Sequence, residues 1–73
     1  MKKIRVLIRP REGLLDPQGR AVEELLRDRG FRVKGLRVGK LLEFEVEEDT
    51  DVREMVEKYV VNPLIEEFEI EES

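Results

Sequence analysis

The chain has 73 residues, 44% of them charged, and a formal net charge of −4. It lacks cysteine and histidine, and its only serine and threonine are Ser73 and Thr50, which excludes disulfides, thiolate metal sites and most nucleophilic side chains. No apolar run exceeds three residues, so we expect a cytoplasmic protein with neither a transmembrane helix nor a signal peptide. We expect a single domain over residues 1–73, with no metal site and no active site of its own.

The charges are unevenly distributed along the chain. Residues 1–40 hold twelve basic and five acidic side chains, whereas residues 41–73 hold two basic and thirteen acidic ones. Such asymmetry marks a nucleic-acid-binding arm or an acidic tail, unless the two halves interleave in the fold and neutralise each other. The abundance of charges, with one asparagine and one glutamine, resembles the composition of heat-adapted proteins. A chain this short buries only about 60% of its unfolded surface, so we also expect it to associate with a copy of itself or with a partner.

The first half of the chain begins with a strand and a helix. Apolar and basic residues alternate over residues 3–9, which predicts a half-buried strand that Pro10 ends. Asp16 before Pro17 predicts the start of a helix, because the carboxylate caps free N–H groups and proline suits the first helical position. Gly30 ends this helix in the position of a left-handed cap. The helix buries one apolar face: Ala21, Val22, Leu25 and Leu26.

The middle of the chain predicts a hairpin. A second strand covers roughly Phe31 to Val38, and its alternation changes parity at Lys34-Gly35, which indicates a bulge or kink. Gly39-Lys40 is typical of a tight turn. The third strand follows, with the apolar positions of Leu42–Val46 facing inward and glutamates facing outward.

The last third predicts a helix and a strand. Asp51 and Glu54 have the spacing of a capping box, and Asn62-Pro63 stops the helix that they begin. A final strand places Phe68 and Ile70 inward, between outward-facing glutamates.

The order β-α-β-β-α-β predicts a ferredoxin-like split sandwich of the α+β class, with an antiparallel sheet in the order 4-1-3-2 and two helices on one face. In this order acidic and basic outward faces alternate from strand to strand, so the two oppositely charged halves of the chain interleave. The outward residues of the two central strands are charged rather than aromatic, and no base-stacking surface results. We therefore expect no nucleic-acid partner.

Three segments spread over nearly the whole chain carry a resemblance to a known family. LLDPQGRAV at the first helix, VGKLLEFEV across the hairpin and NPLIEEFEIE at the end resemble PurS, the small subunit of phosphoribosylformylglycinamidine synthase. The first segment is the most specific of the three. Arg9-Pro10-Arg11 departs from the family's usual sequence by being more basic and stiffer.

The resemblance implies a division of labour within a complex. A glutaminase subunit releases ammonia from glutamine, and a synthetase subunit uses ATP and magnesium to convert formylglycinamide ribonucleotide to its amidine in purine biosynthesis. The small subunit has no active site and binds no cofactor. It forms a homodimer, or a dimer of dimers, and joins the other two subunits so that ammonia passes between them.

Two stretches are the candidate partner-binding site. A glycine in the first turn of a helix costs about 1 kcal/mol relative to alanine, which indicates a close backbone approach there. The structural alternatives are a simple helix start with a hydrophobic staple for the first stretch and a hairpin turn for the second. The candidate residues are Gly13, Leu14, Gln18 and Gly19, followed by Arg37, Gly39 and Lys40.

A second function remains open at this stage. Regulatory modules of the ACT type share the β-α-β-β-α-β order and bind amino acids at a glycine-containing loop after the first strand, a position that Gly13 and Gly19 would also suit. A standalone enzyme is the third reading, and no constellation of residues supports it.

Overall fold

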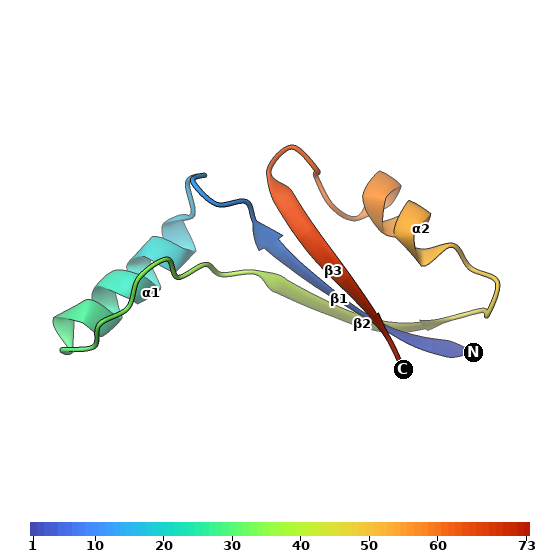
Figure 1. The fold of residues 1–73 in the computed structure, drawn as a ribbon, viewed down its shortest axis with the longest axis horizontal. Helices are drawn as coiled ribbons and strands as arrows, with labels where there is room; N and C mark the ends of the chain where they lie inside the picture. Colours follow the sequence, from blue (N-terminus) through green and yellow to red (C-terminus); the bar gives the residue numbers. More distant parts are fainter.

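The computed structural model describes all residues, 1–73, and contains three strands and two helices. The elements follow the order β1 (Lys2–Pro10), α1 (Pro17–Asp28), β2 (Lys40–Val46), α2 (Val52–Tyr59) and β3 (Glu66–Glu72), as Figure 1 shows. The predicted α+β class is therefore confirmed.

The three strands form one antiparallel sheet in the order β2-β1-β3. The central strand β1 pairs with both neighbours, and Val6 lies across from Leu42 on β2 and from Ile70 on β3. Because side chains alternate between the faces of a strand, this register puts most apolar positions of the three strands on one face, while Leu7 and Leu41 lie across from each other on the opposite face.

A small core lies between this face and α2. Six buried residues form it, three from β1 and three from α2 and the residues after it. Leu42, Phe44 and Phe68 on the outer strands are half-buried against this cluster. The six are Ile4, Val6, Ile8, Val52, Val56 and Val61.

Both helices begin where the sequence predicts. Asp16 accepts a hydrogen bond from the Gly19 N–H, and Asp51 accepts one from the Glu54 N–H, so each aspartate caps its helix. After α1, Gly30 has a φ of +93°, the left-handed conformation expected for the cap.

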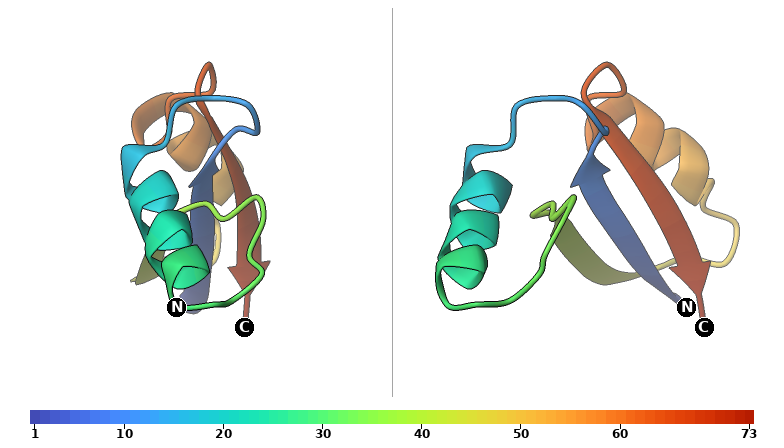
Figure 2. Two further views of the ribbon diagram at one scale, coloured as in Figure 1. Left: turned by 90° about the vertical axis from the view of Figure 1, so that its left-hand side faces the viewer. Right: turned by 60° about the vertical axis from the view of Figure 1, so that its left-hand side comes forward.

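The remaining expectations about the fold need correction. The predicted order 4-1-3-2 is confirmed only for its 3-1-4 part, which corresponds to β2-β1-β3. The predicted second strand, residues 31–39, pairs with no strand of the chain. The prediction of a hairpin turn at Gly39-Lys40 is wrong, because the backbone runs straight into β2 (Figure 1). The prediction that both helices cover one face of the sheet is also wrong, since only α2 covers the sheet (Figures 1 and 2).

The side chains of α1 explain why residues 31–39 do not form a strand with the rest of the sheet. The N–H of Leu36 donates to Glu23 at 3.1 Å and the N–H of Val38 donates to Asp16 at 3.0 Å. These carboxylates occupy positions that a neighbouring strand's carbonyl groups would take. The kink predicted at Lys34-Gly35 is present, with a φ of +71° at Gly35.

The chain is therefore elongated rather than compact. We call residues 31–39 the return segment, and α1 with the return segment (residues 16–39) the arm. The arm projects from the end of the sheet, and the molecule measures 48 × 25 × 13 Å. Its radius of gyration is 15.3 Å, whereas a compact domain of this length has about 11 Å. The arm consequently lacks the tertiary packing that a globular domain would give it.

The outer face of the sheet carries alternating charges. Arg5 on β1 lies 3.6 Å from Glu43 on β2 and 3.6 Å from Glu71 on β3. Arg9 reaches Glu67 at 3.1 Å and Glu69 at 2.8 Å, both on β3. The oppositely charged halves of the sequence therefore interleave, as the alternation of outward charges predicts.

Arg5→Glu should destabilise the fold, because it places like charges on three adjacent strands. Exposed pairs are individually weak, so we expect a loss of about 1 kcal/mol, or a fall of about 4–8 °C in the melting temperature, with partial recovery in high salt. Arg20→Glu, the same charge change on α1, is the control. An equal effect of both variants at low ionic strength would contradict the cross-strand pairing.

Candidate partner-binding site

The candidate residues gather where the arm leaves the sheet. Three segments meet there: residues 11–16 between β1 and α1, the end of the return segment, and residues 60–65 between α2 and β3. The N–H of Arg11 donates to the carbonyl oxygen of Ile65 at 2.9 Å, and its guanidinium donates to that of Pro63, also at 2.9 Å. These bonds fasten the two loops side by side at one end of the sheet (Figure 2).

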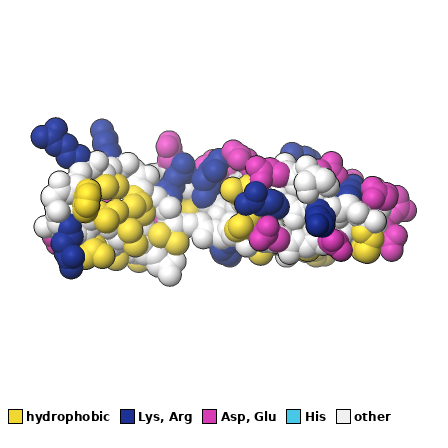
Figure 3. Space-filling view, turned by 90° about the horizontal axis from the view of Figure 1, so that it is seen from below, with side chains coloured by type: hydrophobic (Ala, Val, Ile, Leu, Met, Phe, Trp, Pro, Cys, Tyr) yellow, Lys and Arg dark blue, Asp and Glu magenta, His cyan; other side chains and the backbone are white.

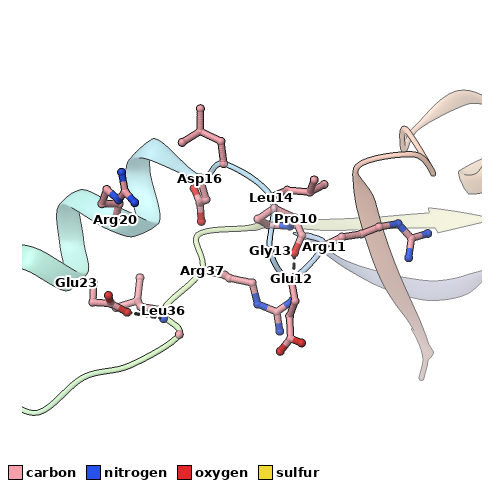
Figure 4. A pocket seen from close by; sticks show the side chains of 12 residues that line it. Pro10, Arg11, Glu12, Gly13, Leu14, Asp16, Arg20, Glu23, Leu36 and Arg37 are labelled. Carbon is pink, nitrogen blue, oxygen red and sulfur yellow. Dashed lines mark hydrogen bonds between the residues drawn. The ribbon is translucent and has the colours of Figure 1, made fainter.

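Asp16 joins the start of α1 to the return segment. One carboxylate oxygen accepts from the Gly19 N–H at 3.0 Å, and the other accepts from the Val38 N–H at 3.0 Å. Both bonds favour the ionised form, and they hold the pKa of Asp16 below its ordinary value, with the bond from Gly19 contributing most. In Figure 4 the Asp16 side chain points from α1 toward the return segment.

Gly19 is buried, and the reason lies within the chain itself. A Cβ at this position would collide with the Asp16 carboxylate and would stand 2.9 Å from the Leu36 carbonyl oxygen. The close backbone approach that the sequence indicated is therefore the approach of the return segment. Contact of Gly19 with a partner stays a prediction.

Arg37 ties the arm to the sheet. Its guanidinium donates to the Pro10 carbonyl oxygen at 3.1 Å and to Glu67 at 2.8 Å. Glu67 also accepts from Arg9, and the two guanidinium groups lower the pKa of Glu67, Arg37 having the larger effect. The same network raises the pKa of Arg9 through its bonds to Glu69 and Glu67. The predicted site residue Arg37 thus has a structural role at the base of the arm.

Two open hollows adjoin this junction. The first, of about 400 Å³, is lined by charges of both signs, and Figure 4 shows Arg37 and Asp16 on its walls. Gly13, at a φ of +83°, and Leu14 belong to its loop wall. The hollow presents three acidic and three basic side chains: Glu12, Asp16, Glu23, Arg11, Arg20 and Arg37.

The second hollow, of about 390 Å³, is more apolar. It brings together four of the predicted site residues, Leu14, Gln18, Gly39 and Lys40. The Gln18 amide forms no hydrogen bond within the chain, and the Lys40 ammonium is held only by Glu66, at 3.6 Å. Its apolar walls are Ile8, Leu14, Leu15, Val38 and Ile65.

Apolar loop tips beside the hollows were missed by the sequence reasoning. Leu15 is 79% exposed and Leu64 is 83% exposed, on the two loops that Arg11 fastens together. Ile65, half exposed, lies between them and the second hollow. A signal was available, because Leu64-Ile65 is an apolar pair that belongs to no helix stripe or strand alternation. The sequence assigns a role only to the neighbouring Asn62-Pro63, as a helix stop.

Gly39 allows the end of the return segment to lie close beside β1. A Cβ at Gly39 would collide with the carbonyl oxygen of Ile8, so the glycine serves a close approach of two backbones rather than a hairpin turn. Lys40 is then the first residue of β2, with its ammonium directed to Glu66.

The fold is a small antiparallel α+β domain, consistent with the ferredoxin-like class. Residues 3–73 match the sequence model of the family described as "PurS: Phosphoribosylformylglycinamidine (FGAM) synthase". The chain belongs to this PurS family.

Individual relatives agree with this assignment. A phosphoribosylformylglycinamidine synthase subunit PurS from Bacillus subtilis is 38% identical over 77 residues, covering 97% of this chain and 92% of the relative. The solved B. subtilis PurS structure has a TM-score of 0.84 at 37% identity and covers 100% of this chain and 99% of its own. A chain in the structure of PurLQS from Thermotoga maritima has a TM-score of 0.83 at 34% identity, covering 99% of this chain and 96% of its own.

These relatives make the chain a subunit of phosphoribosylformylglycinamidine synthase in purine biosynthesis and do not favour the ACT-type regulatory alternative. None of the helices has the length and apolar character needed to cross a membrane.

Asp16→Asn should loosen the arm and change how stability depends on pH. Asparagine has one acceptor oxygen where the aspartate uses two, so one of the bonds from Gly19 and Val38 is lost. Because the folded-state pKa of Asp16 is lowered, its bonds stabilise the fold above the ordinary aspartate value of about 3.9 and are lost as the pH falls through the lowered pKa.

We therefore expect Asp16→Asn to unfold at lower urea concentration at pH 7 and to lose less stability than the parent chain between pH 5 and pH 3. The control is Asp28→Asn, an exposed aspartate on α1 with no bond to lose. Parallel pH curves for the parent and Asp16→Asn would contradict the role given to this carboxylate.

Proposed function

We propose that this subunit is a non-catalytic adaptor, which joins the glutaminase and the ATP-dependent synthetase subunits of the complex. The observation that carries the proposal is the junction at the base of the arm, where exposed apolar loop tips border two open hollows. Exposed apolar tips beside unpaired polar groups are features of surfaces that other proteins cover. The T. maritima structure described as PurLQS supports an assembly of this kind.

In this proposal the chemistry lies entirely in the partner subunits. The glutaminase releases ammonia, and the synthetase uses ATP and magnesium to form formylglycinamidine ribonucleotide from formylglycinamide ribonucleotide. Ammonia that escapes into neutral water is protonated and ceases to be a nucleophile, so the two active sites must be held together. The adaptor itself binds neither ATP nor magnesium, and the complex works in the cytoplasm.

The adaptor also acts as a homodimer or a dimer of dimers. Only six residues form its buried core, which is little for a chain of 73 residues. Leu25 is 52% exposed and Phe31 is 61% exposed on the arm. In Figure 3 hydrophobic side chains gather at the end of the molecule that the arm forms, while charges dominate the sheet.

Sedimentation at micromolar concentration should show a species of at least twice the 8.6 kDa chain. Leu25→Glu should shift the equilibrium toward the single chain, because it introduces a charge into the apolar end of the arm. Glu24→Gln, on the neighbouring exposed position of α1, should leave the equilibrium unchanged. A dominant 8.6 kDa species for the parent chain would refute the homodimer.

Substitutions in the second hollow should uncouple ammonia delivery. Gln18→Ala removes a free amide that suits a backbone contact across an interface, and Leu14→Ser removes apolar surface beside it. In the reconstituted complex we expect glutamine-dependent turnover to fall several-fold while turnover with high ammonium persists. Gly19→Ala is unsuitable for this assay, because its methyl group would disturb Asp16 and Leu36.

The matched control is Glu24→Ala, an exposed position on α1 outside both hollows. Each variant is first checked for its circular dichroism spectrum and its oligomeric state. Full glutamine-dependent turnover of both hollow variants would place the contact surface elsewhere and count against the proposed site.

A further inference from the structure

We propose that the open edge of β3 receives an extended segment of a partner subunit, which adds to the sheet as a further strand. The segment that fits this edge carries basic side chains at alternate positions, facing Glu69 and Glu71. This inference rests on the adaptor role of the proposed function. It names a second contact surface, on the sheet rather than at the base of the arm, and the kind of segment that binds there.

The backbone groups of β3 are paired on one side of the strand only. Its one neighbour is β1, and no strand lies along its other edge (Figure 1). The Ser73 N–H, just after β3, donates to the Lys3 carbonyl oxygen at 3.1 Å. Every second residue of an antiparallel strand bonds to the same neighbour, so the odd-numbered residues of β3 bond to β1 as Ser73 does. The N–H and C=O groups of Phe68, Ile70 and Glu72 therefore point toward the open edge.

The edge of β3 lacks most of the features that protect edge strands from pairing. Such strands are commonly short, bulged or interrupted by proline. β3 instead runs for seven residues in unbroken register with β1, contains no proline and has no residue with a positive φ. Its remaining protection is charge, because five of the seven residues are glutamates. Two such edges repel each other, so a second β3 does not fit, whereas a basic segment does.

The carboxylates beside the edge on the outer face are only half used. Glu69 accepts from Arg9 at 2.8 Å and Glu71 lies 3.6 Å from Arg5, each through its Oε1 atom. Both glutamate side chains remain more than half exposed, and their Oε2 atoms accept no hydrogen bond within the chain. A cation directly across from either glutamate on an added strand extends the alternation of charges that β2, β1 and β3 begin.

The inner face of the edge calls for apolar side chains at the intervening positions. Phe68 and Ile70 are half-buried against the core, and the Arg53 guanidinium stands 5.5 Å from the centroid of the Phe68 ring. Apolar side chains of an added strand would cover the rest of these two residues. The neighbour that β3 already has shows the same pattern, because β1 alternates basic outward and apolar inward positions over residues 3–6.

The return segment of a second copy is the basic stretch outside the sheet that competes for this edge. It carries Arg32 and Lys34 at alternate positions, but the left-handed Gly35 turns the backbone immediately after them. The N–H groups of Leu36 and Val38 beyond the turn are bonded to side chains of α1. The alternation therefore ends after three residues, against seven in β3, and a continuous basic segment of another subunit fits the edge better.

Hydrogen exchange in the assembled enzyme tests the added strand at single residues. The isotope-labelled subunit is exchanged alone and in the complex reconstituted with the glutaminase and synthetase subunits, and its amides are read by NMR after acid quenching and separation. We expect the Phe68 and Ile70 amides to be fast in the subunit alone and at least tenfold slower in the complex. The Glu69 and Glu71 amides, which bond to β1, should be slow in both.

Two results of this measurement would overturn the proposal. Phe68 and Ile70 amides that stay fast in an assembled complex with normal turnover refute the added strand and leave the adaptor role standing. Amides that are already slow in the subunit alone mean that a second copy occupies the edge. Subunits that do not associate at all refute the adaptor role, and the added strand with it.

A matched pair of variants tests the same contact by affinity. Ile70→Pro removes the N–H that faces the open edge and leaves the bonds to β1 in place, whereas Ile70→Ala shortens the side chain and keeps the N–H. We expect Ile70→Pro to bind the larger subunits at least tenfold more weakly than Ile70→Ala, once circular dichroism shows that both are folded. Equal affinities would count against pairing through the backbone.

The charge of the edge is tested separately, which keeps the proposal open to refutation if Ile70→Pro does not fold. Glu69→Gln with Glu71→Gln should weaken binding of the larger subunits and make the affinity less dependent on salt. The control, Glu24→Gln with Asp28→Asn, removes two exposed charges from α1 and should change neither. The same salt dependence in both double variants would contradict a basic occupant.

Discussion

The carboxylate of Asp16 accepts one hydrogen bond from the first turn of α1 and one from the return segment, and the shape of the arm depends on these two hydrogen bonds. It brings the return segment so close to α1 that position 19 has no room for a side chain. With Glu23 it also occupies the N–H groups on one edge of the segment and leaves the other edge open. A helix cap that would ordinarily be local therefore decides which surface the chain offers to others.

A second constraint is the size of the core. The sheet and α2 enclose six buried residues, and the arm contributes none of them. Burying a large apolar side chain stabilises a fold by about 1.5–3 kcal/mol, so an arm whose apolar face lies in solvent leaves much of the available stabilisation unused. Leu15 and Leu64, the exposed loop tips at the junction, likewise lie outside this core. The small core and the exposed arm therefore support the association that we propose for this subunit.

Most of the local structure could be predicted from the sequence, because local rules determine it. The alternation over residues 3–9, the caps at Asp16 and Asp51 and the left-handed Gly30 each involve neighbours in the chain. The hairpin at Gly39 could not be predicted, since a glycine suits a turn and a close backbone approach equally well and only Ile8, 31 residues earlier, decides between them. The candidate site residues lie together around one junction, where contacts within the chain hold Gly19 and Arg37, and their contact with a partner stays a prediction.

The central claim is that a second copy covers the apolar face of the arm, and backbone hydrogen exchange measured across a dilution series tests it most directly. If a second copy covers the exposed apolar face of the arm, the amides of residues 16–39 exchange slowly at concentrations where the dimer persists. They become fast when dilution separates the copies, while the amides of the central strand β1 remain protected. Fast exchange over residues 16–39 at concentrations where sedimentation shows a dimer would contradict the account.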